Sequence, residues 1–388
     1  MTARSLLGYG VAFLFCWGCG TGDETPEYPK ACADIYDDGA VPTFELEIAP
    51  NELTAMQGDC EAKRKQYRPA TFRYGSETRS VMVRLKGNWS WRCEKYQFLI
   101  SFNEVDSKAR FHGLRKIVLD APWYDPTLLN ERMAFSFVRR RGLPASCVNH
   151  AKLMLNGAYY GVYSNVERID KEYLERQFPG TEADGNLYDG GVELRTNEDV
   201  NDTSRRDQLL ASRDFASIDQ LSDLEQMLRV WATEAVLPNP DSYWAGVDIN
   251  YFLYDHPTRG FQHLPYDMDM AARVDLGESL VKADPILYEN RDWGRKPLYQ
   301  TVLSNEATCR RFQTEVRSAL DAYDPVELSA NVARWATQIS KHVADDPHKP
   351  YTFEQHQQGV TGLRAFFAKR KSFVESWLKT EHCPVKWP

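Results

Sequence analysis

Two aspartates stand two positions apart at the end of a strand-like stretch. Residues 263–270 have the sequence His-Leu-Pro-Tyr-Asp-Met-Asp-Met, which places Asp267 and Asp269 on one face of an extended chain. Two carboxylates held this close repel each other and raise one pKa, unless a hard cation such as Mg²⁺ neutralises both. The pair is therefore a candidate metal site. A capped turn with two solvated acids is the alternative that this motif leaves open.

A second polar group precedes this pair in the chain. Asp241 follows Asn239-Pro240, and Asn250 opens a β-rich stretch at 250–254. An isolated Asp after Pro is usually a turn or a helix cap. However, an acid, then an Asn at the mouth of a strand, then a hairpin that ends in further acids is an order that phosphoryl transfer can use. A kinase needs a carboxylate to orient the acceptor hydroxyl, and an Asn and an Asp to hold metal.

The N-terminal half offers a phosphate-binding pair. Lys86 ends a strand-like stretch, and Glu131 lies on a helix that follows. Protein kinases hold the α and β phosphates with a strand Lys that is paired with a helical Glu. Lys95 is a second candidate for the phosphate role. Taken singly, a strand-end Lys is most often solvent exposed, and a Glu in the first turn of a helix often compensates the helix dipole.

The elements that must position these residues follow from hydrophobic periodicity and turn signals. In the N-terminal part we expect strands, one helix between Pro126 and the stop signals Gly142 and Pro144, and a hairpin around Asn156-Gly157. The predicted strands are 44–48, 81–86, 96–102, 151–155 and 158–166, and the predicted helix is 127–141.

The hydrophobic pattern of the C-terminal part is mainly helical. It predicts helices at 219–237, 327–344 and 353–378, one β-hairpin at about 250–266, and a polar loop at 196–206. A chain of 388 residues also exceeds the ~100 to 200 residues typical of one domain. We therefore expect an α+β chain of two lobes: an N-lobe sheet with one helix at 32–167, and a larger, mainly helical C-lobe at 168–388.

Composition limits the classes of function. Hydrophobic residues make up 43% and charged residues 26%, as in ordinary globular proteins, which argues against disorder and coiled coil. Lys and Arg number 47 against 55 Asp and Glu, so the net charge is 47 − 55 = −8. Such a surface would repel a phosphate backbone, so nucleic acid is not an expected partner.

The first residues predict export. Residues 6–17 carry no charge and form a run that is too short to span a bilayer but suits a signal peptide, which we place at 1–19. The run ends at Cys19 in a pattern like a bacterial lipobox, which predicts a lipid anchor on the cell envelope or surface. Cleavage and secretion, or retention of the segment as an anchor, are the alternatives. Residues 20–31 then predict a solvated tether.

The remaining cysteines agree with an oxidising compartment. They number six and permit three disulfides. They are Cys32, Cys60, Cys93, Cys147, Cys309 and Cys383. A zinc site is the weaker interpretation, because no two of them stand two to four residues apart.

Eight ordered blocks of this sequence resemble the spore coat protein H (CotH) family, whose members have a divergent protein-kinase-like fold. The blocks are 84–88 (Arg-Leu-Lys-Gly-Asn), 125–132, 142–144 (Gly-Leu-Pro), 156–163, 167–171, 185–188, 250–254 and 265–269 (Pro-Tyr-Asp-Met-Asp). The resemblance spans most of the chain.

The resemblance implies transfer of phosphate from ATP to Ser or Thr of a protein outside the cytoplasm, with Mg²⁺ or Mn²⁺. It assigns roles residue by residue. Asp241 matches the catalytic acid and Asp267 the principal metal ligand; Asn250 and Asp269 are further metal ligands; Lys86 and Glu131 form the phosphate-gripping pair; and Glu167 lies where a hinge would meet the adenine.

Three hypotheses remain open at this point. The first is an exported kinase, based on Asp241, Asn250, Asp267 and Asp269 occurring in this order. The second is a non-catalytic surface, adhesion or coat protein on the same fold, since ATP is scarce outside cells. The third is a metal-dependent hydrolase that uses Asp267 and Asp269.

Overall fold

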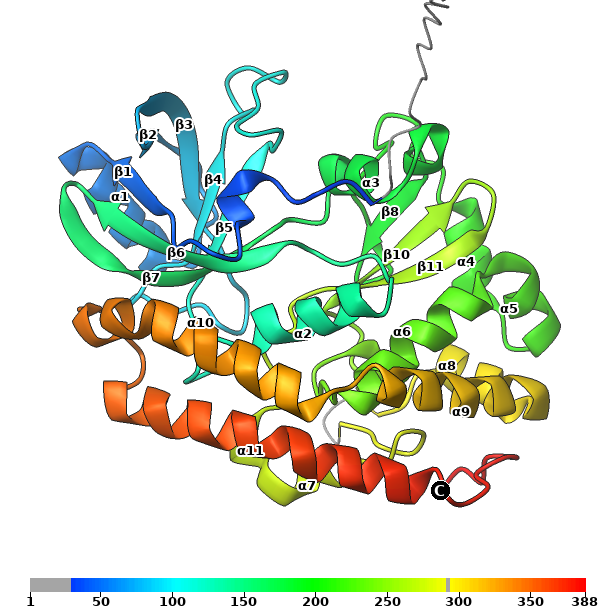
Figure 1. Cartoon of the computed structure of the whole chain (residues 1–388). Coiled ribbons are helices and arrows are strands. Elements are labelled where there is room, and N and C mark those ends of the chain that lie inside the picture. The colour runs from blue at the N-terminus through cyan, green and yellow to red at the C-terminus, as the bar shows by residue number, and fades with distance from the viewer. Residues whose placement is uncertain (1–28, 291–293) are drawn as a thin grey trace, which may run out of the picture.

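A computed structural model describes residues 29–290 and 294–388. The chain forms a β-rich N-terminal lobe and a mainly helical C-terminal lobe (Figure 1). The predicted signal peptide and most of the predicted tether lie outside the described residues. Among the described helices, none is both long and apolar enough to span a bilayer.

Seven strands of the N-terminal lobe close into a barrel, in the order β1-β2-β3-β4-β5-β7-β6. β1 pairs with β6 in parallel, and the other neighbours are antiparallel. The strands are β1 (Thr43–Glu47), β2 (Arg68–Tyr74), β3 (Glu77–Leu85), β4 (Phe98–Ser101), β5 (Lys116–Asp120), β6 (Val148–Leu155) and β7 (Ala158–Val166). Their inward side chains form an aromatic-rich core with the helix α1 (Pro50–Glu61). The predicted sheet is therefore a closed barrel, which leaves no free sheet edge.

The strongest short-range signal of the sequence is confirmed. β6 and β7 are joined by Asn156-Gly157, with φ values of 49° and 81°. A two-residue hairpin turn needs positive φ at both positions, and Asn followed by Gly tolerates this conformation best.

The predicted helix of the N-lobe is the helix α2 (Asn130–Arg140), which begins three residues later than expected. Leu128 has a φ of 58°, and the Asp125 carboxylate accepts hydrogen bonds from the backbone N–H groups of Thr127 and Asn130. Residues 125–129 therefore form a capped turn before the helix. The apolar face of α2 packs into the larger core, together with the C-terminal helices.

The C-terminal lobe contains most of the helices and a second, four-stranded sheet in the order β11-β10-β8-β9. The hairpin predicted near 250–266 is β10 and β11, and the pairing of β8 and β9 with it was not expected. The elements are α3 (Lys171–Gln177), β8 (Asn186–Asp189), β9 (Glu193–Leu194), α4 (Ser204–Ala211), α5 (Phe215–Leu221), α6 (Leu224–Val236), β10 (Tyr251–His256), β11 (Gly260–Pro265), α7 (Gly277–Val281), α8 (Pro297–Ser304), α9 (Glu306–Asp321), α10 (Pro325–Asp345) and α11 (Phe353–Trp377). Four short 3-10 helices complete the described elements: η1 (Asp34–Tyr36), η2 (Gly180–Ala183), η3 (Tyr243–Ala245) and η4 (Val274–Leu276).

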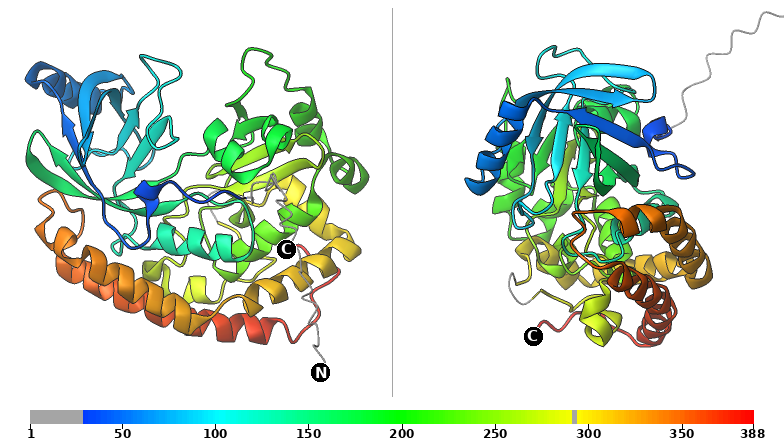
Figure 2. Two further views of the ribbon diagram at one scale, coloured as in Figure 1. Left: turned by 45° about the horizontal axis from the view of Figure 1, so that its top comes forward. Right: turned by 90° about the vertical axis from the view of Figure 1, so that its left-hand side faces the viewer.

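The single helix predicted at 219–237 is two helices. Ser222 and Asp223 separate α5 from α6 because Asp223 caps the second helix, where its carboxylate accepts from the backbone N–H of Gln226. The Asp223 N–H itself donates to the Phe261 carbonyl of β11. The helices predicted at 327–344 and 353–378 are confirmed as α10 and α11, which lie side by side beneath both lobes (Figure 1, Figure 2).

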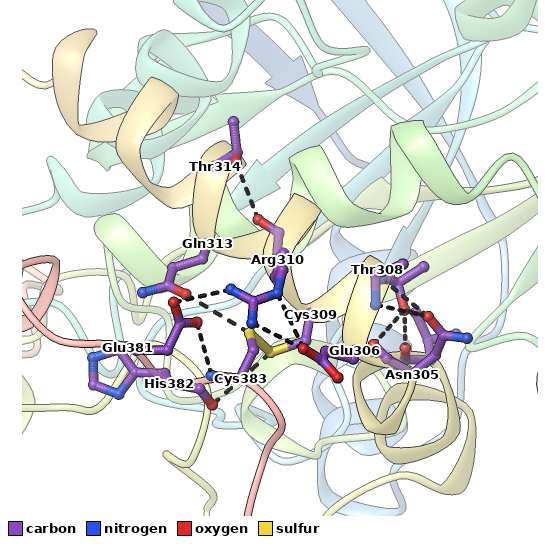
Figure 3. The surroundings of a disulfide bond; sticks show 12 residues. Asn305, Glu306, Thr308, Cys309, Arg310, Gln313, Thr314, Glu381, His382 and Cys383 are labelled. Atoms are coloured by element: carbon purple, nitrogen blue, oxygen red, sulfur yellow. Dashed lines mark hydrogen bonds and ion pairs between the residues drawn. A yellow bond between two sulfur atoms is a disulfide. The ribbon is translucent and has the colours of Figure 1, made fainter.

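The six cysteines form three disulfides, as the sequence permits. They pair as Cys32–Cys147, Cys60–Cys93 and Cys309–Cys383. The last one ties α9 to the C-terminal segment, beside the exposed ion pair of Arg310 and Glu381 (Figure 3).

Candidate active-site cleft

Six of the eight candidate residues lie in one cleft, a cavity of about 310 Å³ whose lining comes from both lobes. This volume is at the lower end of the range of small-molecule sites. The six residues are Lys86, Glu131, Asp241, Asn250, Asp267 and Asp269. The barrel contributes further lining from the ends of β3, β4 and β5, and the C-lobe contributes residues around β8 to β11.

The hairpin of β10 and β11 holds two of these side chains together. Asn250 immediately precedes β10 and Asp267 follows β11 by one residue, while the N–H of Tyr266 donates to the Asn250 carbonyl at 3.2 Å. Asn250 and Asp267 have φ values of 61° and 51°, a left-handed conformation that non-glycine residues seldom adopt. Strained backbone of this kind clusters at functional sites, where the surrounding structure maintains it.

Asp241 is joined to this hairpin by Asn250. The Asn250 side-chain amide donates to the Asp241 carboxylate at 2.6 Å and to the Asp241 carbonyl at 3.0 Å. Burial raises the pKa of Asp241, although the Asn250 hydrogen bond and the charge of Arg273 oppose the shift. The acid and the Asn that the sequence placed nine positions apart are therefore direct neighbours.

The carboxylates of the cleft repel one another. Burial and the charge of Asp120 raise the pKa of Asp267 to about 6. Burial also raises the pKa of Asp269 and that of Glu131, and in both cases the charge of Asp267 adds to the effect. This excess of carboxylates within electrostatic reach of one another calls for a cation.

The lysine of the cleft has a different partner from the predicted one. Lys86 forms an ion pair with Asp120, at the end of β5, and not with Glu131. Burial acts to lower the pKa of Lys86, but Asp120, Tyr266 and Asp267 together outweigh it and the pKa is raised. Glu131 remains close enough for the Lys86 charge to act on its pKa. The sequence carried a usable signal for Asp120, because it ends an apolar strand in the same way as the stretch before Asp267.

Lys95 and Glu167 lie outside the cleft. The ammonium of Lys95 is buried against α10, where it donates to the Asp346 carboxylate at 2.6 Å and to the Val162 carbonyl at 2.8 Å. The Glu167 carboxylate is buried against Arg176 at 2.5 Å and accepts from the Cys147 N–H at 2.9 Å. Of the two candidate lysines, the structure thus places only Lys86 beside the carboxylate cluster. The Glu167 side chain does not contact the cavity.

The donor set suits a hard divalent cation. Among residues 29–290 and 294–388, no three His, Cys, Asp or Glu side chains are arranged to hold a metal by themselves. Mg²⁺ is commonly bound by one or two carboxylates, and substrate phosphates and water supply its other ligands. Asp267, Asp269 and Asn250 offer oxygen ligands of this type. Such an ion would also relieve the repulsion between the two aspartate carboxylates.

A barrel lobe and a helical lobe that share a cleft lined by a lysine, several carboxylates and an asparagine define a protein-kinase-like scaffold. The model of the CotH kinase protein family matches residues 83–374, and the chain belongs to this family. The predicted α+β fold with two kinase-like lobes is therefore confirmed.

Curated relatives agree with this assignment. The chain is 21% identical to the inner spore coat protein H of Bacillus subtilis (strain 168) over 366 residues, which cover 87% of this chain and 98% of the relative. It is 23% identical to an inner spore coat protein H-like protein of the same organism over 303 residues, which cover 74% and 87%.

Two solved structures are more distantly similar. The Helicobacter pylori proinflammatory kinase CtkA matches with a TM-score of 0.39 at 12% identity, covering 76% of this chain and 95% of that one. HipA in a Shewanella oneidensis toxin–antitoxin complex with HipB and operator DNA matches with a TM-score of 0.32 at 15% identity, covering 69% and 60%.

Proposed function

We propose that this protein is an exported kinase that transfers the γ-phosphate of ATP to Ser or Thr of a protein, with Mg²⁺ or Mn²⁺. The observation that carries the proposal is the convergence of Lys86, Asp241, Asn250, Asp267 and Asp269 in one cleft between the lobes. These residues come from distant parts of the chain, and their types match what phosphoryl transfer needs.

In this proposal each side chain has a distinct task. Asp241, held by Asn250, orients the acceptor hydroxyl and receives its proton as the oxygen attacks the γ-phosphorus. The bond from the γ-phosphorus to the bridging oxygen breaks, and ADP leaves with the electron pair. Asp267 and Asp269 hold the metal, which neutralises charge on the phosphates.

Phosphate transfer tests the proposal. The purified protein is incubated with γ-labelled ATP, Mg²⁺ or Mn²⁺ and a general protein acceptor, and label on protein is measured. Wild type should label the acceptor, and Asp267→Ala should lower labelling by at least ~100-fold, because metal-assisted charge stabilisation contributes several kcal/mol. Asp219→Ala, which removes an exposed acid on α5 outside the cavity, is the matched control.

Two results would contradict the kinase. Equal labelling by wild type and Asp267→Ala would show that Asp267 is not needed for phosphate transfer. Release of free phosphate without any label on protein would instead favour a hydrolase.

The proposal includes export and a lipid anchor at Cys19. Three disulfides support an oxidising compartment, where such bonds persist. We expect the wild-type protein to partition with membranes and to incorporate a labelled fatty acid, and Cys19→Ser to lose both properties. Lipid labelling that persists in Cys19→Ser would contradict the anchor.

A further inference from the structure

The inner part of the cleft has little positive charge left for a polyphosphate. Lys86 is already paired with Asp120, and the carboxylates of Glu131, Asp267 and Asp269 lie close by. The charge of a metal ion at Asp267 would be neutralised by these carboxylates. A nucleoside triphosphate carries several negative charges, so further cations are needed to hold its phosphates.

Two cations that line the same cleft have no carboxylate partner among the described residues. Within the described part of the chain, Lys65 and Arg84 form no ion pair with a carboxylate, although both line the cavity. Lys65 donates to the Asn88 side-chain carbonyl at 2.7 Å. Arg84 donates to the Leu85 carbonyl at 2.9 Å, and its guanidinium lies 5.4 Å from the centre of the Tyr67 ring. Both cations are therefore positioned by neutral groups, and no carboxylate of the described residues lies within ion-pair distance of either one.

A third cation approaches from the C-terminal lobe. Arg195, just after β9, lines the cavity and pairs with Asp189 at 2.7 Å and with Glu193 at 2.6 Å. Its Nε–H group is buried and has no hydrogen-bond partner among the described residues. A buried donor without a partner is unfavourable, so a bound acceptor at this position would be stabilising.

These cations line one cavity and lie within electrostatic reach of one another. Partial desolvation lowers the pKa of Lys65, and the charge of Arg84 lowers it further. Lys86 and Arg195 act in the same direction. By contrast, the groups that act on the pKa of Asp267 are Asp120, Lys86 and Asp241. The charges that act on Lys65 are thus mainly positive, with Asp189 opposing them, whereas those that act on Asp267 are mainly negative, with Lys86 opposing them.

We propose that Lys65 and Arg84 of the barrel and Arg195 of the second sheet form an anion subsite that holds the polyphosphate of the nucleotide. This inference rests on the proposed use of ATP and assigns phosphate binding to residues outside the Lys86–Asp120 pair. Because the cations come from both lobes and repel each other, a bound polyphosphate also draws the lobes together at this end of the cleft.

Binding of inorganic tripolyphosphate tests the subsite without any base, sugar or reaction. Calorimetry on the full-length protein compares wild type with the double variant Lys65→Ala/Arg84→Ala, and we expect the variant to bind at least tenfold more weakly. Adenosine binding should be the same in both proteins. Lys108→Ala removes an exposed barrel lysine outside the cavity and should bind tripolyphosphate like wild type.

The double variant also removes the packing of Arg84 on Tyr67, so a single charge reversal that leaves Arg84 in place serves as a second test. Lys65→Glu alters a cleft-mouth side chain with one hydrogen bond, and it should weaken tripolyphosphate binding by more than Lys65→Ala does. Wild-type affinity in Lys65→Glu, or in the folded double variant, would overturn the subsite. Weaker binding of adenosine and tripolyphosphate to the same degree would overturn it as well, because the damage would then be general.

The two proposals fail separately. If wild type transfers phosphate and the double variant binds tripolyphosphate normally, the kinase stands and the subsite is wrong. If wild type transfers no phosphate while tripolyphosphate binding depends on Lys65 and Arg84, the subsite stands and the kinase is wrong.

Discussion

Two lysine–aspartate pairs in different regions of the molecule show how burial separates structure from function. Lys86 and Asp120 pair at the wall of the cleft, with side chains that are 18% and 23% exposed. Lys95 and Asp346 pair between the barrel and the end of α10, with both side chains only 1% exposed. The sequence presents both lysines as candidates for the same role.

The buried pair has no capacity left for a ligand. Asp346 accepts from the N–H groups of Val162 and His348, in addition to the Lys95 ammonium. A Cβ atom on Gly161 would lie 2.6 Å from the Asp346 carboxylate, so even a methyl group has no room there. The cleft pair instead lines a cavity, so its side chains remain accessible.

The largest effect should follow from breaking the buried pair. Lys95→Met leaves the Asp346 charge buried without its cation, which costs roughly 3 to 5 kcal/mol of unfolding free energy. Denaturant unfolding of the variant and wild type measures the loss. The double variant Lys95→Met/Asp346→Asn should recover part of it, because the uncompensated charge is then gone. A loss below ~1 kcal/mol in Lys95→Met would contradict a structural role.

The cleft pair should show the opposite balance. Lys86→Met should lower phosphate transfer by roughly 100-fold, since it removes a charge close to the reacting phosphate. Its unfolding free energy should change by about 1 kcal/mol or less, because Asp120 is partly solvated. Labelling assays and unfolding curves on one preparation separate the two effects. A variant that is fully active but unstable would reverse the comparison.

The sequence predicts local features of this molecule far better than long-range partners. The Asn156-Gly157 turn, α10, α11 and the grouping of Asn250 with Asp267 follow from turn chemistry, periodicity and the short hairpin between them. Asp346, which neutralises Lys95, lies 251 positions away, and no periodicity or spacing connects the two.

Two predictions about the N-terminal lobe were wrong: the first residue of α2 and the partner of Lys86. The helix start was placed too early because a side-chain cap at Asp125 and the left-handed Leu128 are tertiary choices that apolar spacing does not reveal. In the same way, Glu131 is the helical acid that a kinase-like pattern predicts for Lys86. Strand geometry instead brings Asp120 to the lysine, since the ends of β3 and β5 approach each other across β4.

Glu234 extends the comparison to a buried acid that has no lysine. It lies on α6, and burial raises its pKa to about 8 although hydrogen bonds from Ser242 and the Trp244 backbone act to lower it. One of its oxygens has no partner among the described residues, as expected for a protonated carboxyl. Below pH 4.5 the group is neutral in both the folded and the unfolded chain, so its full contribution to stability is present there.

Between pH 4.5 and about 8 the unfolded chain releases this proton while the folded protein retains it. Stability should therefore fall by up to ~1.4 kcal/mol per pH unit across this window. Glu234→Gln is neutral throughout and should gain stability relative to wild type as the pH rises. Unfolding curves at pH 5, 6.5 and 8 measure the difference. Parallel pH profiles of the two proteins would contradict a protonated Glu234.

The smallest effect should come from a pair that has the same residue types and the same separation of charged atoms as the buried one but is exposed. Lys341 and Asp345 lie at the end of α10, one residue before Asp346, and their charged atoms are 2.6 Å apart, the same distance as in Lys95–Asp346. Their side chains are 84% and 52% exposed. Solvent screening leaves such a pair almost no net stabilising effect, so Lys341→Met should unfold almost like wild type. A loss close to that of Lys95→Met would show that distance, and not burial, sets the strength of these pairs.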